Sequence, residues 1–299
     1  MNYLWHLAIL LATYGIVSLG LNLMAGYCGR LSLSQASFFG IGAYAYALLS
    51  LRTSLGFVPA ALTAASLAIG LSLLISLPAA RFRQDFFVIL SLTVQALLYG
   101  TLYNWSSEGN HPGTWSNLTN GPFGLTGIPK PRLSWFVITD MPSMAVFAAA
   151  CLAIVALFCW RLTSSPWGRL LKAVRDDEDV VAGLGKNVRL AEVSAFAFGC
   201  GFAAFAGTVY AGYVSYIDPS VASLDNSILM LSMVIVGGTG NFVGPLVGAC
   251  ALVLIPEALR FLNLPVSVAA NSRLMLYGAL LVVMIHQRPQ GLAGVYRLE

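Results

Sequence analysis

The charged side chains best suited to chemistry gather in one polar segment of an otherwise apolar chain. This segment reads SSPWGRLLKAVRDDEDVVAGLGKNVRLAE over residues 164–192. It predicts two short helices. Ser165 can cap the first, with Pro166 at its N1 position, where the missing N–H costs nothing. Asp176 or Asp177 can begin the second, because either carboxylate can accept hydrogen bonds from free backbone N–H groups.

The chemistry that this pattern favours is recognition of another protein. Basic residues recur at helical spacing in the first helix, and Gly185 suits a left-handed end for the second. A short charged helix can fit a cleft in a partner and pass on its movement as a rigid body. The alternative is a solvated loop. The candidate contact residues are Arg169, Lys172, Arg175, Asp176, Asp177, Glu178, Ala182, Gly185 and Asn187.

No pattern in the sequence predicts catalysis. A phosphate-binding loop needs GxxxxGK[ST], whereas GLGKN at 183–187 lacks the first glycine and the Ser/Thr, and predicts a helix end instead. Residues 199–204 imitate a dinucleotide fingerprint but lie in an apolar run. His6, His111 and His286 share no metal-binding motif. We therefore expect no catalytic residue, no metal and no cofactor on this chain.

The composition indicates a membrane protein. Hydrophobic residues make up 58% of the 299 residues and charged residues only 9%, far below the charged share of a soluble domain. Apolar stretches near the roughly 20 residues that cross a bilayer recur along the chain. We predict an all-α polytopic bundle of about nine spans (eight to ten) forming a single domain, 1–299. The spans lie near 3–26, 37–51, 57–80, 85–105, 142–162, 190–214, 226–240, 242–262 and 273–287, and the short segments 37–51 and 226–240 can be broken or re-entrant.

The placement of basic residues predicts the orientation of the chain. With the N-terminus outside and the C-terminus in the cytoplasm, eleven of the sixteen lysines and arginines fall on inner loops. The polar segment 164–189 then faces the cytoplasm. The turn-rich loop 106–141 lies outside, as a connector or as a dock for a partner, with Trp115, Phe123 and Trp135 available for contacts.

Polar side chains within the spans suggest a pathway for a neutral or zwitterionic solute. For each of them, an interhelical hydrogen bond is the alternative. These residues are Asn22, Ser32, Ser34, Gln35, Thr93, Gln95, Asn226 and Ser232. Small residues that recur every four positions predict faces for close helix packing. They are Gly199, Ala203, Gly207, Ala211 and Ser215, and in a second series Gly240, Gly244 and Gly248. Glu257 can pair with Arg260 one turn later.

The chain resembles the branched-chain amino-acid (Liv-type) permease family of ABC importers over most of its length. The resemblance lies in an ordered series of stretches: GLNLMAGYCGRLSLSQASFFGIGAY, NGPFGL, SPWGRLLKAVRDDEDVVAGLGKNV, MVIVGGTGNFVGPLVGA and RPQGLAG. The sequence departs from the family at Arg30, where a neutral residue is expected. It departs again at Val180, Val181 and Lys186, in a loop that is usually rich in Glu and Ala.

This resemblance implies a permease subunit of the bacterial inner membrane that moves branched-chain or related amino acids inward by alternating access. The segment 164–189 would be the coupling loop that contacts the ATPase. The implied partners are two cytoplasmic ATPase subunits that carry ATP and Mg²⁺, a second homologous permease and an extracytoplasmic binding protein. A urea or short-chain amide importer of the same family is one alternative. A secondary transporter or channel is another, but no buried proton-relay carboxylate stands out.

Overall fold

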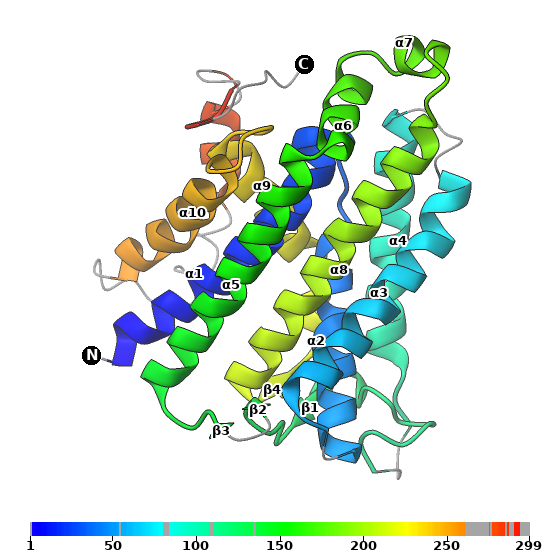
Figure 1. Ribbon diagram of the computed structural model, residues 1–299. Helices are drawn as coiled ribbons and strands as arrows, with labels where there is room; N and C mark the ends of the chain where they lie inside the picture. The colour runs from blue at the N-terminus through cyan, green and yellow to red at the C-terminus, as the bar shows by residue number, and fades with distance from the viewer. Residues whose placement is uncertain are drawn as a thin grey trace.

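The computed structural model describes residues 2–53, 55–79, 84–107, 111–133 and 136–260, together with 275, 277–284, 286 and 290–293. Long helices lean against one another along a common direction (Figure 1), as predicted for an all-α membrane protein. The first half holds α1 (Asn2–Asn22), the π-helical turn η1 (Leu23–Tyr27), α2 (Gln35–Arg52), α3 (Phe57–Ala79) and α4 (Gln84–Asn104). The second half holds α5 (Met141–Ser164), α6 (Pro166–Asp176), α7 (Glu178–Gly183), α8 (Val188–Val214), η3 (Pro219–Ala222), α9 (Leu224–Gly237) and α10 (Gly244–Arg260).

Five helices of the described chain are long and apolar enough to cross a membrane. These segments are Tyr3–Tyr27, Phe57–Leu77, Phe86–Asn104, Met141–Ser164 and Val188–Val214. Each matches a predicted span within a few residues. The ninth predicted span, 273–287, lies partly outside the described residues, although 277–284 are helical.

The two short predicted spans correspond to helices with irregular approaches. A buried non-helical segment, 28–34, leads into the 18-residue α2. Helix α9 has 14 residues and follows the 3₁₀ turn η3. At a rise of about 1.5 Å per residue α9 is roughly 21 Å long, less than the ~30 Å hydrocarbon core. Such interruptions are tolerated at membrane depth only where protein covers the backbone.

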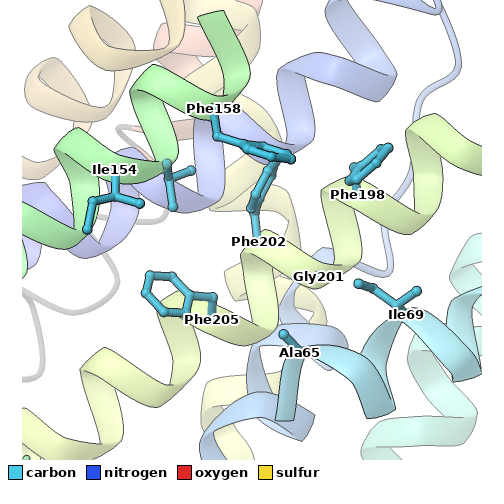
Figure 2. A pocket seen from close by; sticks show the side chains of 9 residues that line it. Ala65, Ile69, Ile154, Phe158, Phe198, Gly201, Phe202 and Phe205 are labelled. Atoms are coloured by element: carbon cyan, nitrogen blue, oxygen red, sulfur yellow. The ribbon is translucent and has the colours of Figure 1, made fainter. Parts of the chain in front are cut away.

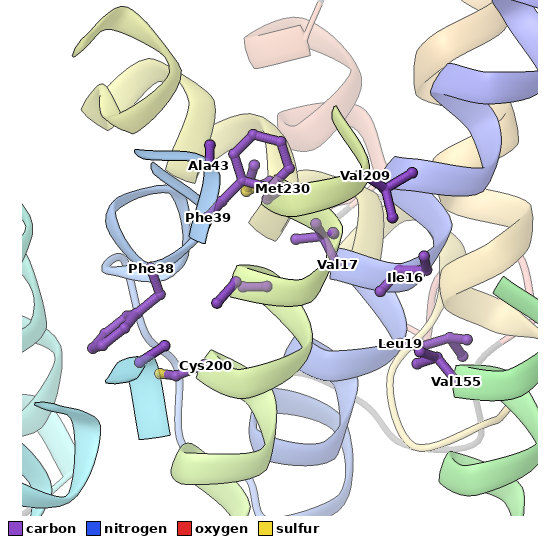
Figure 3. Close-up of a cluster of buried hydrophobic side chains, with 14 of the residues drawn as sticks. Ile16, Val17, Leu19, Phe38, Phe39, Ala43, Val155, Cys200, Val209 and Met230 are labelled. Atoms are coloured by element: carbon purple, nitrogen blue, oxygen red, sulfur yellow. The ribbon is translucent and has the colours of Figure 1, made fainter. Parts of the chain in front are cut away.

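Helix α8 forms the centre of the bundle, in contact with α1, α2 and α3, while α1 also contacts α5, α9 and α10. Buried apolar side chains from α1, α2, α5, α8 and α9 meet around it (Figure 3). Small residues make the closest contacts. A side chain at Gly42 or Gly207 would collide with backbone of the facing helix, so α2 and α8 touch backbone to backbone.

The two ends of the bundle differ (Figure 1). One end carries α6 and α7. The other carries the loop between α4 and α5, with η2 (Gly121–Phe123) and the two-residue strands β1 (Leu125–Thr126), β2 (Arg132–Leu133) and β3 (Phe136–Val137). Strand β1 pairs antiparallel with β4 (Tyr216–Ile217), with Leu125 opposite Ile217, so the loop is tied to the end of α8. Strands β2 and β3 pair with each other.

Candidate functional site

Helix α6 is attached to the bundle along its apolar face. Leu171 and Val174 are buried, and the Trp167 indole Nε1–H donates to Ser194 Oγ on α8 at 2.9 Å. Pro166 occupies the first turn with Ser165 as N-cap residue, as predicted. The predicted capping bond is wrong, because the Ser165 hydroxyl donates to the Leu162 carbonyl of the preceding helix at 2.6 Å.

The three basic residues of α6 do not share one environment. Arg169 is exposed at the end of the bundle. Lys172 Nζ lies 5.3 Å from the centre of the Tyr27 ring, a cation–π distance. The Arg175 guanidinium donates to the Gly26 carbonyl, and its Nη2 to Thr239 Oγ1 at 3.4 Å. Lys172 and Arg175 therefore hold α6 against η1 and the α9–α10 turn, which leaves Arg169 as the exposed cation of the three.

Helix α7 begins and ends at predicted residues. The Asp177 carboxylate accepts hydrogen bonds from the backbone N–H groups of Asp179 and Val180, both at 3.0 Å, which confirms the cap. Gly185 follows the helix with φ of +75°. Asn187 Oδ1 accepts from the Leu190 N–H at 3.0 Å and caps α8.

The outward side of α7 is a mixed surface of apolar and acidic side chains. Val180 and Leu184 are 59% and 74% exposed, whereas Val181 is buried and anchors the helix. Asp176, Glu178 and Ala182 are also exposed. Exposed apolar residues beside carboxylates suit a protein contact better than a purely solvated loop.

Beneath α7 lies an ion-pair cluster that the sequence did not predict. Arg30 Nε donates to Glu192 Oε1 at 2.7 Å, and its Nη2 lies 2.6 Å from the same oxygen. The same Nη2 lies 3.4 Å from Glu178 Oε2. The Phe87 ring centre is 5.8 Å from the guanidinium carbon. A signal existed, because Arg30 and Glu192 are isolated charges at the edges of apolar stretches, but nothing in the sequence pairs them.

Asn22 joins the same end of the bundle to the α9–α10 turn. Its Nδ2 donates to the Asn241 carbonyl at 2.9 Å, and its Oδ1 accepts from the Gly240 N–H at 3.2 Å. Asn241 Nδ2 in turn donates to the Ala293 carbonyl at 2.8 Å. The Asn22 side chain therefore fastens α1 to the α9–α10 turn, and Asn241 fastens that turn to the segment 290–293.

A neutral polar cluster lies deeper in the bundle, where α2, α4, η3 and α9 meet. Its centre is the Gln95 amide on α4. Gln95 Oε1 accepts from the Ser37 hydroxyl at 2.6 Å and from the Ser227 hydroxyl at 3.1 Å, and its Nε2 donates to the Ala222 carbonyl. Ser37 and Ser227 were not predicted, since their partners come from distant parts of the chain.

The segment 28–34 carries the neighbouring polar groups. Ser32 and Ser34 hydroxyls lie 2.9 Å apart, and the Leu33 N–H donates to Ser91 Oγ at 3.0 Å. Gln35 Nε2 donates to the Gly199 carbonyl of α8 at 2.8 Å. Among the predicted pathway residues, the structure thus brings Ser32, Ser34, Gln35 and Gln95 to one buried region.

The remaining pathway candidates bond within their own local segments. Thr93 is exposed on α4, and its hydroxyl donates to the Ile89 carbonyl at 3.0 Å. Asn226 Nδ2 donates to the Ser220 carbonyl at 2.8 Å, and the buried Ser232 hydroxyl to the Ile228 carbonyl at 2.6 Å. These three do not join the Gln95 cluster.

The predicted glycine faces lie at helix contacts with one exception in each series. Gly199 faces Gly20 of α1, Gly207 faces Phe39 of α2, and the contacts of Gly244 and Gly248 are with the end of α9. Gly240 lies in the turn before α10 with φ of +77°, and Ser215 lies beyond α8 with φ of +58°. Each predicted four-residue series therefore runs past its helix into a neighbouring turn.

The Glu257 carboxylate accepts a hydrogen bond from the Tyr3 hydroxyl. Its predicted partner is Arg260, whose side chain lies outside the described part of the structure.

An apolar groove of about 310 Å³ runs between α3 and α5 over α8 (Figure 2). It is lined by Ala65, Ile69, Ile154, Val155, Phe158, Phe198, Gly201, Phe202 and Phe205. No lining side chain is charged or can form a hydrogen bond, so the groove has no partner for the carboxylate of an amino-acid solute. Among the described residues no group of three His, Cys, Asp or Glu side chains could hold a metal ion.

Known proteins resemble the chain along nearly its whole length. The sequence profile of the branched-chain amino acid transport system permease component matches residues 3–285. The high-affinity branched-chain amino acid permease LivM of Escherichia coli K12 is 32% identical, over 97% of this chain and 70% of LivM. The probable LivM of Methanocaldococcus jannaschii is 27% identical over 93% and 90% of the two chains. The autoinducer 2 import permease LsrC of Salmonella paratyphi B is 24% identical over 60% and 49%. No solved structure matches.

Proposed function

Because the chain belongs to the branched-chain amino acid transport permease family, we propose that it is a membrane-spanning subunit of an importer driven by ATPases on separate chains. The solute is a branched-chain or related amino acid, moved inward by alternating access. The observation that carries this proposal is the 32% identity to LivM across 97% of the chain.

The anchored α6–α7 pair is the proposed contact with the ATPase. Its exposed residues Arg169, Asp176, Asp177, Ala182 and Asn187 form the docking side, while Lys172 and Arg175 fasten α6 to the bundle. Because α6 is firmly attached to the bundle, a movement of the ATPase can pass through the α6–α7 pair to the membrane helices as a rigid-body movement. The nucleotide and Mg²⁺ belong to the partner, because Gly185 here ends a helix and the loop to Asn187 follows no strand.

Charge distribution supports an orientation with α6 and α7 in the cytoplasm. Arg161, Arg169, Lys186 and Arg189 are exposed near this end, as the positive-inside rule requires. Helix α1 begins toward the opposite end (Figure 1), which supports an N-terminus outside. The bond of Asn241 Nδ2 to the Ala293 carbonyl holds 290–293 at the α9–α10 turn, beside α6, which supports a C-terminus inside.

The outer loop is the proposed dock for a solute-binding protein. Trp115 and Phe123 are 78% and 77% exposed, and the β1–β4 pair ties the loop to α8. Trp135 lies outside the described residues. A second, homologous permease completes the pathway as a heterodimer, and two ATPase subunits act on the two coupling loops.

The buried region around Gln95 is the proposed part of the pathway on this chain. It offers hydroxyl and amide groups without a fixed charge, which suits a zwitterion that carries both charges itself. These groups hydrogen-bond to one another, so the pathway is closed at this point. A solute can pass only when these hydrogen bonds break and the groups bond to the solute instead. Asn226 and Ser232 of α9 lie on a neighbouring element and move with it.

The test is purification of the chain from its native membrane in mild detergent through a C-terminal tag. We expect an ATPase to co-purify and its activity to rise when a binding protein loaded with leucine is added to the reconstituted complex. Stimulation by urea or a short amide instead would assign the alternative solute. A lone chain that transports without any ATPase would overturn the proposal in favour of a secondary transporter or channel.

A further inference from the structure

Arg30 occupies an unusual position for a charged residue. It lies in the non-helical segment 28–34, between η1 and α2, and its side chain is only 9% exposed. Its backbone N–H donates to the Met24 carbonyl at 3.2 Å, which ties the segment back to η1. An arginine buried at this depth needs charged or polar partners, because an unpaired one would be very costly.

The two carboxylates that meet Arg30 differ in exposure. Glu192 is 6% exposed on α8, the central helix, and both contacts to it are shorter than 2.8 Å. Glu178 is 55% exposed on the six-residue α7, and its contact is longer, at 3.4 Å. Water can replace Arg30 at Glu178 but not at Glu192. The Arg30–Glu192 pair is therefore fixed, whereas the Arg30–Glu178 pair can break and form again.

Stability alone does not account for this arrangement. A buried ion pair contributes little compared with apolar residues of similar volume, because both charges lose their hydration. Arg30 instead connects three elements through one side chain: α7, α8 and the segment leading into α2. Two residues beyond Arg30, Ser32 enters the buried polar region described above.

We propose that Arg30 is a positioning residue that passes the movement of α7 to the start of α2 through its contact with Glu178, while Glu192 holds its guanidinium in place. This inference rests on the proposed function, because α7 moves only if an ATPase acts on it. When α7 shifts, the exposed contact changes first, and the segment 28–34 follows through Arg30. A neutral residue at position 30 would lack the charge that pairs with both carboxylates at once.

The first test is the variant Glu178→Gln in the reconstituted complex. We expect solute-stimulated ATPase activity and solute moved per ATP to fall about fivefold or more, a coupling change of ordinary size. Both quantities are measured per co-purified ATPase, so that a change in assembly is separated from a change in coupling. The matched control is Asp179→Asn, the same charge change on the neighbouring residue of α7, which should leave coupling intact. Equal behaviour of the two variants would overturn the inference.

A charge exchange separates the connection to Arg30 from a direct contact of Glu178 with the ATPase. The double variant R30E/E192R restores the buried pair but places a carboxylate opposite Glu178, so it should insert and assemble yet remain uncoupled. Adding Glu178→Arg should recover at least half of the stimulation. A triple variant that assembles but stays uncoupled would show that Glu178 acts on the ATPase directly. An absence of stimulation in the unaltered complex would instead contradict the proposed function.

Discussion

The Arg30 cluster and the Gln95 cluster solve the problem of burying polar groups in different ways. Around Arg30, one cation pairs with two carboxylates at the end of the bundle that carries α6 and α7. Around Gln95, an amide and two hydroxyls satisfy one another deeper inside. The first arrangement is sensitive to the loss of either buried member, Arg30 or Glu192, because an unpaired buried charge is left behind. The second loses only hydrogen bonds, which membrane packing tolerates better.

The largest expected effect comes from removing the charge of Arg30 alone. The Arg30→Met variant leaves Glu192 buried without its cation, and breaking a buried pair in this way costs about 3–5 kcal/mol. We expect a marked loss of thermal stability of the detergent-purified chain, measured by fluorescence-detected gel filtration after heating. The double variant R30M/E192M should recover most of the loss. A double variant as unstable as the single one would show that packing, and not charge, holds this region together.

The second prediction concerns the neutral cluster. Gln95→Leu removes the acceptor for Ser37 and Ser227 and the donor to Ala222. Each hydrogen bond in a membrane bundle stabilises by roughly 0.6 kcal/mol, so we expect a loss of about 2 kcal/mol, smaller than for Arg30→Met. The same heating assay makes the comparison. If Gln95→Leu were the more damaging change, the difference between the two clusters would disappear.

Sequence reasoning predicted the local features of both regions and missed their long-range partners. Asp177, Gly185 and the span positions were predictable because caps and apolar runs depend on neighbouring residues. The Arg30–Glu192 pair joins residues 162 positions apart, and the Gln95–Ser227 bond joins residues 132 apart. Such pairs depend on how the helices pack, which one sequence does not reveal. For the same reason the inward direction of Lys172 and Arg175 was not predicted.

A smaller effect is expected where a single cap holds the charged region in place. Asp177→Ala removes the acceptor for two backbone N–H groups of α7, and the loss of such a cap costs about 1 kcal/mol. We expect faster amide hydrogen exchange confined to α7, without change in α8. Asp176→Ala is the control, because the adjacent carboxylate does not cap the helix. Protection of α7 that survives Asp177→Ala would mean that Val181 and the Glu178 contact suffice to hold it.

The smallest effect is expected at Thr93, which lies on α4 together with Gln95 but faces the other way. Its hydroxyl bonds to its own helix at Ile89 and is exposed on the surface of the chain, so Thr93→Val keeps the shape and loses little. We expect unchanged stability and unchanged leucine uptake into proteoliposomes, whereas Gln95→Leu should slow uptake. Because the two positions are two residues apart on one helix, the pair reports which face of α4 the solute meets. Slower uptake in Thr93→Val would place the pathway on the outer face of α4, where a second permease subunit would have to close it.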